Sequence, residues 1–596
     1  MPAVSPMENA EGVVRVQLYA DGVALDESVQ MMSVSVRRAV NSVPSARIEL
    51  LDGDMPERSF PVSDGEHFKP GVVLAIHAGY GDDLKPLFEG IVVRHGVQIR
   101  GDNEARLVIE CRDRAVRMTV GRRNANFIDQ SDSDIITTLA QGHAMDIDVD
   151  ATGASHREIA QHYCSDWDFM LSRADANGLL VVATDGKLAV KAPVDRAAAL
   201  AVTYGQDLID FHADIDARGQ YASAQAFSWD MKTQAAVEGT ESRPATLPLQ
   251  GDLDSATLAQ VVGLATYRLQ SGAPQAAETL QQWAKALQLK AGLARLRGRM
   301  RFQGSALALV GGLIELVGVG KRFSGKVFVT GLHHEIGDGA WTTEAEFGLS
   351  PDWFVERTDV AAPPGAGLLP GVHGMQVGVV MKLDADPAGE VRVQVGVPVL
   401  QARTAGIWAR LMQFHGSSSF GAFFLPEVGD EVVLGYFADD PSHPVVLGSL
   451  YSSKRPPPYP LEARNDIKAI VTRCKSKIEF QETDHIITVT TPQNNKIVIN
   501  DKLKSIVLQD ETGNMVEMAP GGITLDSPKD ILINAKGNIT LKALRNIAAS
   551  ATADVTVDGM NVNCAAQVGL KATGNASAEL SAAGQTVVKG AIVMIN

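Results

Sequence analysis

The clearest pattern in this 596-residue chain is an eight-residue repeat of apolar positions near its C-terminal end. Aliphatic residues recur every eight positions from position 523, and a second apolar residue follows each of them two positions later. The pairs are Ile523 and Leu525, Ile531 and Ile533, Ile539 and Leu541, Ile547 and Ala549, and Val555 and Val557. Each pair fits a short strand with one apolar face, and a single copy of such a unit leaves that face exposed. The repeat therefore predicts strands that stack into a rod.

Eight residues supply only about one strand and one turn. A coil of a single-chain β-solenoid normally has about three faces and ~18 or more residues, so one copy of this chain lacks two walls. Three chains wound around a common axis would supply those walls and pair the backbone groups. We therefore predict a homotrimeric, intertwined β-helix over residues 475–596. Its core is predicted at Ile523, Leu525, Ile531, Ile533, Ile539, Leu541, Ile547, Val555 and Val557.

Two alternatives to the trimer are a single-chain solenoid and a disordered low-complexity tail. The regular aliphatic spacing disfavours the tail. Upstream of position 523, apolar pairs come nine or ten residues apart, from Ile478 and Phe480 to Val516 and Met518. Phe480 is the only aromatic residue after Lys475, so this part of the sequence lacks the side chains of an ordinary globular core.

Residues 1–360 are predicted to form a mixed, β-rich region. Alternating apolar and polar side chains predict strands at 13–19, 46–51, 72–77, 106–111 and 179–183. Helices are predicted at 132–141, 166–177 and 276–297. Ser131 is a good N-cap for the first helix, and Gly178 is a good C-cap for the second.

Two joints rich in Pro and Gly separate three parts of the chain. Residues 361–371 form the first predicted linker, and residues 452–474 form the second. Between them, residues 372–451 are predicted to form a small closed barrel of five or six short strands. These strands are predicted at 377–383, 391–397, 407–412, 422–425, 431–436 and 445–447. The predicted fold class is therefore mainly β and multidomain.

The composition excludes some classes of function. A net charge of −16 argues against a general binder of nucleic acid or of anionic membranes. The four cysteines lie far apart without a C-x-x-C spacing, so a thiolate metal site or a disulfide framework is not expected. Residues 1–12 lack the features of a secretory signal, and no apolar run is long enough to span a bilayer. We therefore expect assembly in the cytoplasm and export by a route without a cleaved signal.

Candidate chemistry is weak throughout the sequence. His333 and His334 are adjacent on a predicted strand, so their side chains point to opposite faces and are poorly placed to share a metal ion. Residues 318–322 lack the first glycine and the final Ser or Thr of a phosphate-binding loop. Asp166 and Asp168 are expected to cap and solvate a helix rather than to act as acid and base. We therefore predict no catalytic residue, no metal and no cofactor.

The barrel segment resembles the OB-fold of VgrG and phage-baseplate spike proteins. The resemblance rests on residues 378–380, 386–389, 391–395, 407–410, 424–431 and 440–451. Residues 537–541, 577–581 and 588–596 resemble the end of a VgrG spike, and residues 165–169 and 330–341 resemble the tail-hub domains of the same family.

This resemblance implies a homotrimeric structural spike and hub of a contractile injection system, such as a type VI secretion system or a phage-tail-like particle. Residues 1–360 would then hold two similar β-barrel domains that match a three-fold spike to a six-fold inner tube of an Hcp-like protein. The apex would bind a PAAR-like tip protein at Ile592, Val593, Met594, Ile595 and Asn596. Other baseplate proteins and effector cargo would be partners, and firing would deliver the particle outside the cell through a target envelope.

Some relatives in this resemblance carry a lysozyme domain or an iron-binding apex. The linker before position 475 is too short for an enzyme domain, and His485 is the last histidine, so neither is expected here. The main alternative is a trimeric tail fibre that binds a receptor or a carbohydrate. A fibre usually ends in an aromatic-rich tip, which this sequence lacks after Phe480. A cell-wall-degrading enzyme is a third and less favoured possibility.

Overall fold

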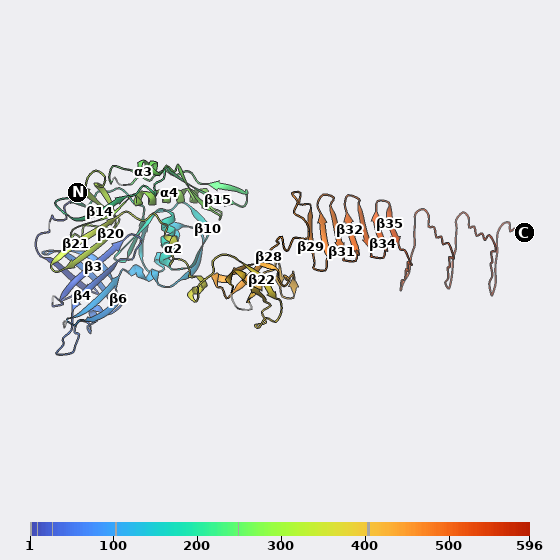
Figure 1. Ribbon diagram of the computed structural model, residues 1–596, viewed down its shortest axis with the longest axis horizontal. Coiled ribbons are helices and arrows are strands. Elements are labelled where there is room, and N and C mark those ends of the chain that lie inside the picture. The colour runs from blue at the N-terminus through green and yellow to red at the C-terminus, as the bar shows by residue number, and fades with distance from the viewer. Residues whose placement is uncertain are drawn as a thin grey trace. The chain divides into compact units, whose positions relative to one another are not determined.

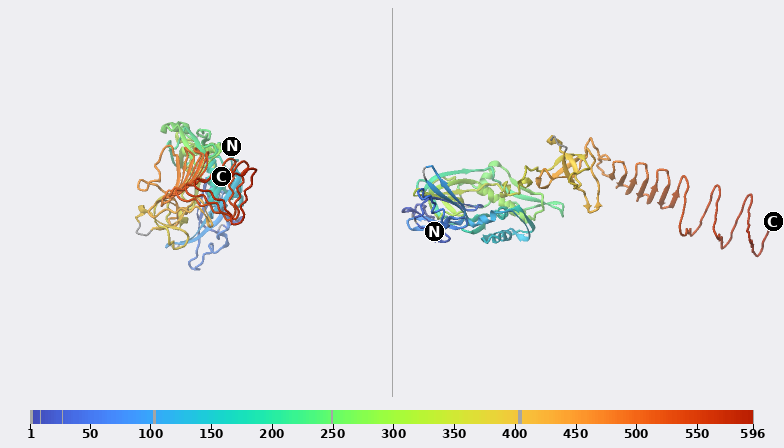
Figure 2. Two further views of the ribbon diagram at one scale, coloured as in Figure 1. Left: turned by 90° about the vertical axis from the view of Figure 1, so that its right-hand side faces the viewer. Right: turned by 90° about the horizontal axis from the view of Figure 1, so that it is seen from below.

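A computed structural model describes residues 3–8, 10–26, 28–101, 104–247, 250–401 and 406–595 of the chain. It separates into two compact units, Met1–Leu450 and Tyr451–Asn596 (Figures 1 and 2). Strands dominate both units, and residues 376–449 contain a closed barrel. The predicted mainly-β, multidomain fold class is therefore confirmed.

The largest element of the N-terminal unit is a 13-stranded sheet. Its strands are β1 (Val14–Ala20), β2 (Val23–Ala24), β3 (Met31–Ala39), β4 (Ser45–Leu51), β5 (Val73–Tyr80), β6 (Asp83–Ile99), β7 (Ala105–Arg112), β13 (Leu200–Thr203), β14 (Leu208–Ile215), β18 (Leu296–Gln303), β19 (Leu313–Val317), β20 (Gly325–Gly337) and β21 (Ala340–Phe347). Alternate side chains enter two cores, one on each half of the sheet. Ile48 and Leu50 of β4, and Met300 and Phe302 of β18, are fully buried there.

The two halves of this sheet have the same strand order. The path β6-β7-β4-β3 joins the path β20-β21-β18-β14 through an antiparallel pair of β3 and β20. Each path contains four strands, which can be numbered 1 to 4 in chain order. In both paths their spatial order is then 3-4-2-1. A further pair of strands extends each set. β5 and β1 follow β6, and β19 and β13 follow β20, although β1 runs antiparallel to β5 and β13 runs parallel to β19. The unit therefore contains two six-strand modules in tandem.

Smaller elements surround this sheet. They are β8 (Arg123–Ser131), β9 (Asp146–Val149), β10 (Ser155–Cys164), β11 (Leu180–Thr184), β12 (Lys187–Lys191), β15 (Ser223–Asp230), β16 (Ala235–Glu238), β17 (Thr266–Ser271), α1 (Asp132–Gln141), α2 (Asp166–Ala176), α3 (Ser255–Val262) and α4 (Ala277–Ala294). The Ser131 side chain caps α1 in a capping box with Asp134, as a serine before an acidic first turn favours. The third predicted helix is too long at its end, because Leu296 already belongs to β18.

The barrel consists of β22 (Gln376–Lys382), β23 (Val393–Gly396), β24 (Ile407–Leu411), β28 (Pro444–Ser449) and β27 (Glu431–Tyr436), in that spatial order. Val380, Val395 and Leu434 are buried at its centre. The strand expected at 422–425 is absent from the described structure there, and a short hairpin of β25 (Gly416–Ser417) and β26 (Phe420–Gly421) precedes this segment. Its apolar residues are consecutive rather than alternating, so they do not present one face to the barrel core.

The C-terminal unit begins with a single-layered antiparallel sheet of seven strands (Figure 1). They are β29 (Ile467–Val471), β30 (Lys477–Gln481), β31 (Ile486–Thr490), β32 (Lys496–Asn500), β33 (Ser505–Gln509), β34 (Met515–Ala519) and β35 (Gly522–Asp526). Each strand pairs with the next along the chain. The first strand, β29, lies within residues 452–474, the segment expected to be a linker.

Candidate functional site on the C-terminal sheet

One face of the C-terminal sheet carries two columns of apolar side chains. The strand register places each apolar residue opposite the apolar residue of the next strand, as Val489 lies opposite Ile497. The first column runs through Ile470, Ile478, Val489, Ile497, Leu508, Val516 and Leu525. The second runs through Phe480, Ile487, Ile499, Ile506, Met518 and Ile523. We call these thirteen side chains the apolar ladder.

The apolar ladder is uncovered in the single chain. Ile478, Ile487, Ile497 and Leu508 are between 38 and 42% exposed, whereas Ile48 in the N-terminal sheet is fully buried. Covering that remaining area would contribute roughly 1–2 kcal/mol for each side chain, at ~25 cal/mol per Å². A continuous apolar face of this size on a soluble protein marks a contact surface.

Polar turns follow one edge of the apolar ladder and fix its rungs. The Asn495 amide nitrogen donates to Thr491 Oγ1 at 3.1 Å, and the Asn514 amide nitrogen donates to Asp510 Oδ2 at 2.6 Å. The bond from Asn514 is the main reason why the pKa of Asp510 is lowered to about 2. The Glu511 backbone N–H donates to Asn495 Oδ1 at 3.1 Å, which links one turn to the next.

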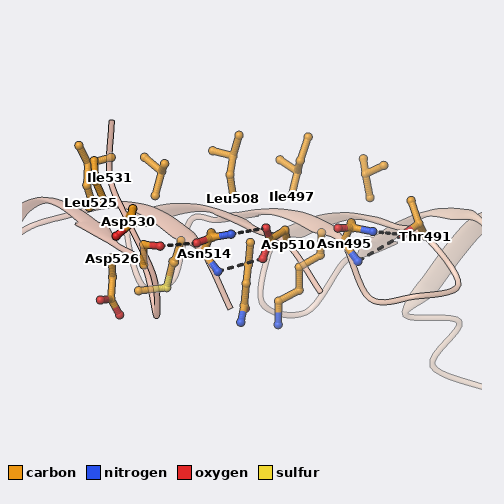
Figure 3. A pocket seen from close by; sticks show the side chains of 16 residues that line it. Thr491, Asn495, Ile497, Leu508, Asp510, Asn514, Leu525, Asp526, Asp530 and Ile531 are labelled. Atoms are coloured by element: carbon orange, nitrogen blue, oxygen red, sulfur yellow. Dashed lines mark hydrogen bonds between the residues drawn. The ribbon is translucent and has the colours of Figure 1, made fainter. Parts of the chain in front are cut away.

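An open groove of about 650 Å³ lies against this part of the apolar ladder. Figure 3 shows Ile497, Leu508, Leu525 and Ile531 projecting on one side of the backbone, while the hydrogen-bonded turn residues lie along it. The groove has an apolar wall and a polar rim.

The predicted trimer-core residues fall into two groups. Ile523 and Leu525 lie on β35, where they pair with Met518 and Val516 and end the two columns. The other seven lie in the described residues 527–595, where the chain forms no strand pair with itself. They are Ile531, Ile533, Ile539, Leu541, Ile547, Val555 and Val557, each between 53 and 73% exposed.

The backbone of residues 527–595 nevertheless follows the eight-residue period. Bends recur at 528–529, 536–537, 544–545 and 552–553, with extended segments between them (Figure 1). The predicted tip residues Ile592, Val593, Met594 and Ile595 are extended or bent and between 48 and 91% exposed. The fifth, Asn596, lies outside the described residues.

The other sequence candidates are occupied by structural contacts. His334 is buried and its Nδ1 lies 2.9 Å from Thr343 Oγ1, whereas His333 Nε2 lies 2.8 Å from Ser35 Oγ. Burial lowers the pKa of His334 to about 3, with smaller contributions from Arg38 and His333. No cluster of three or more His, Cys, Asp or Glu suited to a metal ion occurs among the described residues.

The two aspartates of α2 have different environments. Asp168 belongs to the helix N-terminus, where Ser165 Oγ accepts from its backbone N–H at 3.1 Å. Asp166 was expected to be solvated, but it is buried and its Oδ2 lies 2.7 Å from His143 Nε2. Gln161 also donates to it at 2.9 Å. The carboxylate therefore ties a helix to a neighbouring strand.

Sequence reasoning missed a second buried cluster around Asp132. Burial alone would raise the pKa of Asp132, but hydrogen bonds from His156, Arg173 and Asn177 hold this pKa below its usual range. Arg173 Nε donates to Asp132 Oδ1 at 2.6 Å. These residues come from β10, α1 and α2, so no local spacing in the sequence signals them. All of these contacts hold elements together, and they leave the apolar ladder as the candidate functional site.

Two family models match parts of the chain. Residues 10–338 match the family described as "Alg8 N-terminal domain". Residues 376–451 match the "Type VI secretion system/phage-baseplate injector OB domain". The chain belongs to the Alg8 N-terminal domain family and to the VgrG and phage-baseplate hub-spike family.

A curated relative, the type VI secretion system spike protein VgrG1b of Pseudomonas aeruginosa, is 26% identical over 192 residues. That alignment covers 30% of this chain and 25% of the relative, so the chain spans about a quarter of its length. Among solved structures, the 43 kDa tail protein of prophage MuSo2 from Shewanella oneidensis has a TM-score of 0.44 at 10% identity, over 57% of this chain and 98% of that protein. The Escherichia coli c3393 protein, a type VI secretion component, has a TM-score of 0.35 at 14% identity, over 73% of this chain and 99% of that protein. None of the described helices is both long and apolar enough to cross a membrane.

Proposed function

We propose that this chain is the spike and hub subunit of a contractile injection apparatus and that it acts as a homotrimer. The observation that carries the proposal is the uncovered apolar ladder of β29–β35, followed by residues 527–595, which we call the octad segment. Within the described part of the chain, the octad segment forms no strand pair. Both segments expose apolar side chains that further copies of the chain can cover. The match of residues 376–451 to an injector OB domain supports the assignment to such an apparatus.

The 13-stranded N-terminal sheet and the seven-stranded C-terminal sheet suggest a division of labour. Residues 1–360 form the hub that contacts an inner tube of an Hcp-like protein and other baseplate proteins. Residues 475–596 form the spike, whose strands from three chains share one core and give a stiff rod that pierces the target envelope. The N-terminal modules come in tandem, so three chains would present six modules to a six-fold tube.

The proposal extends to the end of the spike. Ile592 to Ile595 are apolar and exposed and have no strand partner among the described residues, which suits a PAAR-like tip protein. The role of the chain is mechanical, without catalysis or a cofactor, and effector cargo travels with the spike. Assembly takes place in the cytoplasm, and firing delivers the spike outside the cell.

The test places a charge on each face of one strand. Ile497 belongs to the apolar ladder, whereas the partly buried Val498 lies on the opposite face between Thr488 and Val507. We expect I497K to abolish the trimer, because a lysine in the shared core would lose its hydration without a partner charge. V498K is the matched control and should still assemble.

Sedimentation of the full chain gives the answer. The wild-type protein and V498K should have three times the chain mass of 63.5 kDa, and I497K should have the mass of one chain. A wild-type protein that stays folded as a single chain at micromolar concentration would refute the proposal. Trimeric I497K would show that the apolar ladder is not the shared core.

A further inference from the structure

The eight-residue period of the octad segment is interrupted once. The bends of its backbone end eight residues apart as far as Ala553. The next bend is at Met560, only seven residues later. The spacing of eight then returns, with bends that end at positions 568, 576, 584 and 592. One repeat of the segment is therefore one residue shorter than the others.

The apolar pairs of the sequence shift at the same place. As far as Val555, the first residue of each pair follows the previous one by eight positions, and five residues connect each pair to the next. After Val557 only four residues, 558–561, precede the next pair, which is Val562 and Cys564. Five-residue connections then return, and the later pairs of small or apolar residues are Leu570 and Ala572, Ala578 and Leu580, and Thr586 and Val588. We call Val562 with Cys564, together with these later pairs, the distal pairs.

Each pair keeps a constant distance from the bend before it. Val555 lies two positions after the bend that ends at Ala553, and Val562 lies two positions after the bend at Met560. The same offset places Leu570 after the bend that ends at position 568. The bends describe the backbone and the pairs describe the side chains, and both place the short repeat between Val555 and Val562.

A strict eight-residue grid would place charges in the core beyond Val557. It would carry Lys571, Glu579 and Lys589 to inward positions. A charge buried without a partner is strongly unfavourable. Successive side chains of a strand point to opposite faces, so a shift by one residue exchanges the inward and outward sets. With the short repeat, these three charged residues lie on the outer face and the distal pairs contain no charge.

The distal pairs are uncovered in the single chain. Val562 and Leu570 are 54% and 73% exposed, much as Ile539 and Leu541 before the short repeat are 53% and 73% exposed. Like the repeats before it, this described part of the octad segment forms no strand pair with its own chain. The distal pairs therefore present the same kind of uncovered apolar face as the apolar ladder, in continuity with it along the chain.

We propose that the octad segment contains one seven-residue repeat, and that the distal pairs continue the core shared by three copies of the chain. The surface that covers them is the same face of two further copies. Of the predicted tip residues, Met594 then belongs to the core, because it lies eight positions after Thr586, whereas Ile595 lies on the outer face. The inference rests on the trimer of the proposed function and adds which side chains line its core beyond Val557.

The reaction of single thiols with maleimide in the full-length protein tests this frame. C474S removes the other exposed thiol, while Cys111 and Cys164 are buried. In this background Cys564 is the inward position. The matched control adds N563C and C564A, which moves the thiol by one residue to the outer face.

A second pair of variants repeats the test one repeat further along the chain. A572C places the thiol at an inward position and K571C places it at an outward position, each in the background of C474S and C564A. The strict grid predicts the opposite assignment for both pairs, because it places positions 563 and 571 inward.

We expect the Cys564 and A572C thiols to react at least about a hundredfold more slowly than the N563C and K571C thiols, because inward groups react only after local opening. The same reactions in urea should have similar rates for all four thiols. Sedimentation of each variant establishes that the reacting particle is the trimer.

Two results from a trimeric protein would overturn the inference and leave the proposed function intact. Protection of N563C and K571C, with fast reaction of Cys564 and A572C, would show that the strict grid continues to the end of the spike. Equal rates within each pair, whether fast or slow, would show that the distal pairs form no inward face. A protein that sediments as one chain would instead refute the proposed function, and the inference with it.

Discussion

Two sheets of this chain use the same alternation of apolar and polar residues, but only the N-terminal sheet has its apolar side covered by its own chain. In the N-terminal sheet, Ile48 and Leu50 are fully buried under loops and strands of the same chain. In the C-terminal sheet, Ile497 and Ile499 have equivalent alternation and remain 42% and 38% exposed. The first sheet is a folded unit by itself, whereas the second is one wall of a structure that one chain does not complete.

We predict the largest effect for substitutions in the octad segment, residues 527–595. We expect I531D combined with I539D to give single chains or aggregates, because two carboxylates in each chain would enter a shared core without partners. L532D combined with T540D is the control, since Leu532 is 87% exposed and lies between the two core positions of its repeat. Analytical ultracentrifugation measures the mass of each variant. Trimers of the first double variant would contradict the assignment of the core.

The alternation of apolar and polar residues explains which strands could be predicted from the sequence. β1, β4, β5 and β7 were predicted close to their observed bounds, because each has one buried and one polar face. Helix α1 was predicted with its bounds, since the capping residue Ser131 is local. Features that depend on distant contacts were missed, such as the Asp132 cluster and the pairing of β3 with β20.

The family resemblance implied two similar domains within residues 1–360, but the residues alone do not reveal the tandem repeat of the N-terminal sheet. Equivalent strands of the two modules hold largely unlike residues, as in Ser45–Leu51 of β4 and Leu296–Gln303 of β18. The modules share few features of sequence, such as the buried apolar positions Ile48 and Met300 and the pairs Arg47 with Glu110 and Arg299 with Glu346. Helix α3 was not predicted because it is short, although Asp254 caps it and Gly263 ends it at a φ of 76°. A single chain does not cover the apolar ladder. That other copies of the chain cover it is inferred from the exposure of its side chains.

Two matched substitutions that shorten a side chain, I48A and I497A, test whether each sheet has a core within one chain. I48A should lower the free energy of unfolding of the N-terminal unit by about 2–5 kcal/mol, because it leaves a cavity in a closed core. We expect this loss to be the same at all protein concentrations. I497A should instead lower the thermal midpoint of the spike by an amount that depends on concentration, because its core forms only on association.

Calorimetry of the full chain over a hundredfold range of concentration separates the two effects. An I497A midpoint that does not depend on concentration would mean that the C-terminal sheet is stable within one chain. A concentration-dependent I48A loss would mean that the core of the N-terminal sheet also needs a partner.

The smallest predicted effect concerns His334, which is buried in the N-terminal sheet. Burial lowers the pKa of His334 from 6.5 to about 3, so the folded chain holds this imidazole neutral. The unfolded chain takes up a proton below pH 6.5, and the folded chain does not until about pH 3. The contribution of His334 to stability is therefore complete above pH 6.5 and is lost as the pH falls toward 3, by up to about 1.4 kcal/mol per pH unit.

Urea unfolding of the N-terminal unit between pH 7 and 5 measures this loss, and the difference between wild type and H334Q isolates it from other titrating groups. The wild type should lose more free energy of unfolding over this range than H334Q, by roughly 2 kcal/mol from the linkage slope. Equal slopes for wild type and H334Q would show that water or a shift of β20 solvates the imidazole, and the N-terminal sheet would then be less completely covered than the comparison assumes.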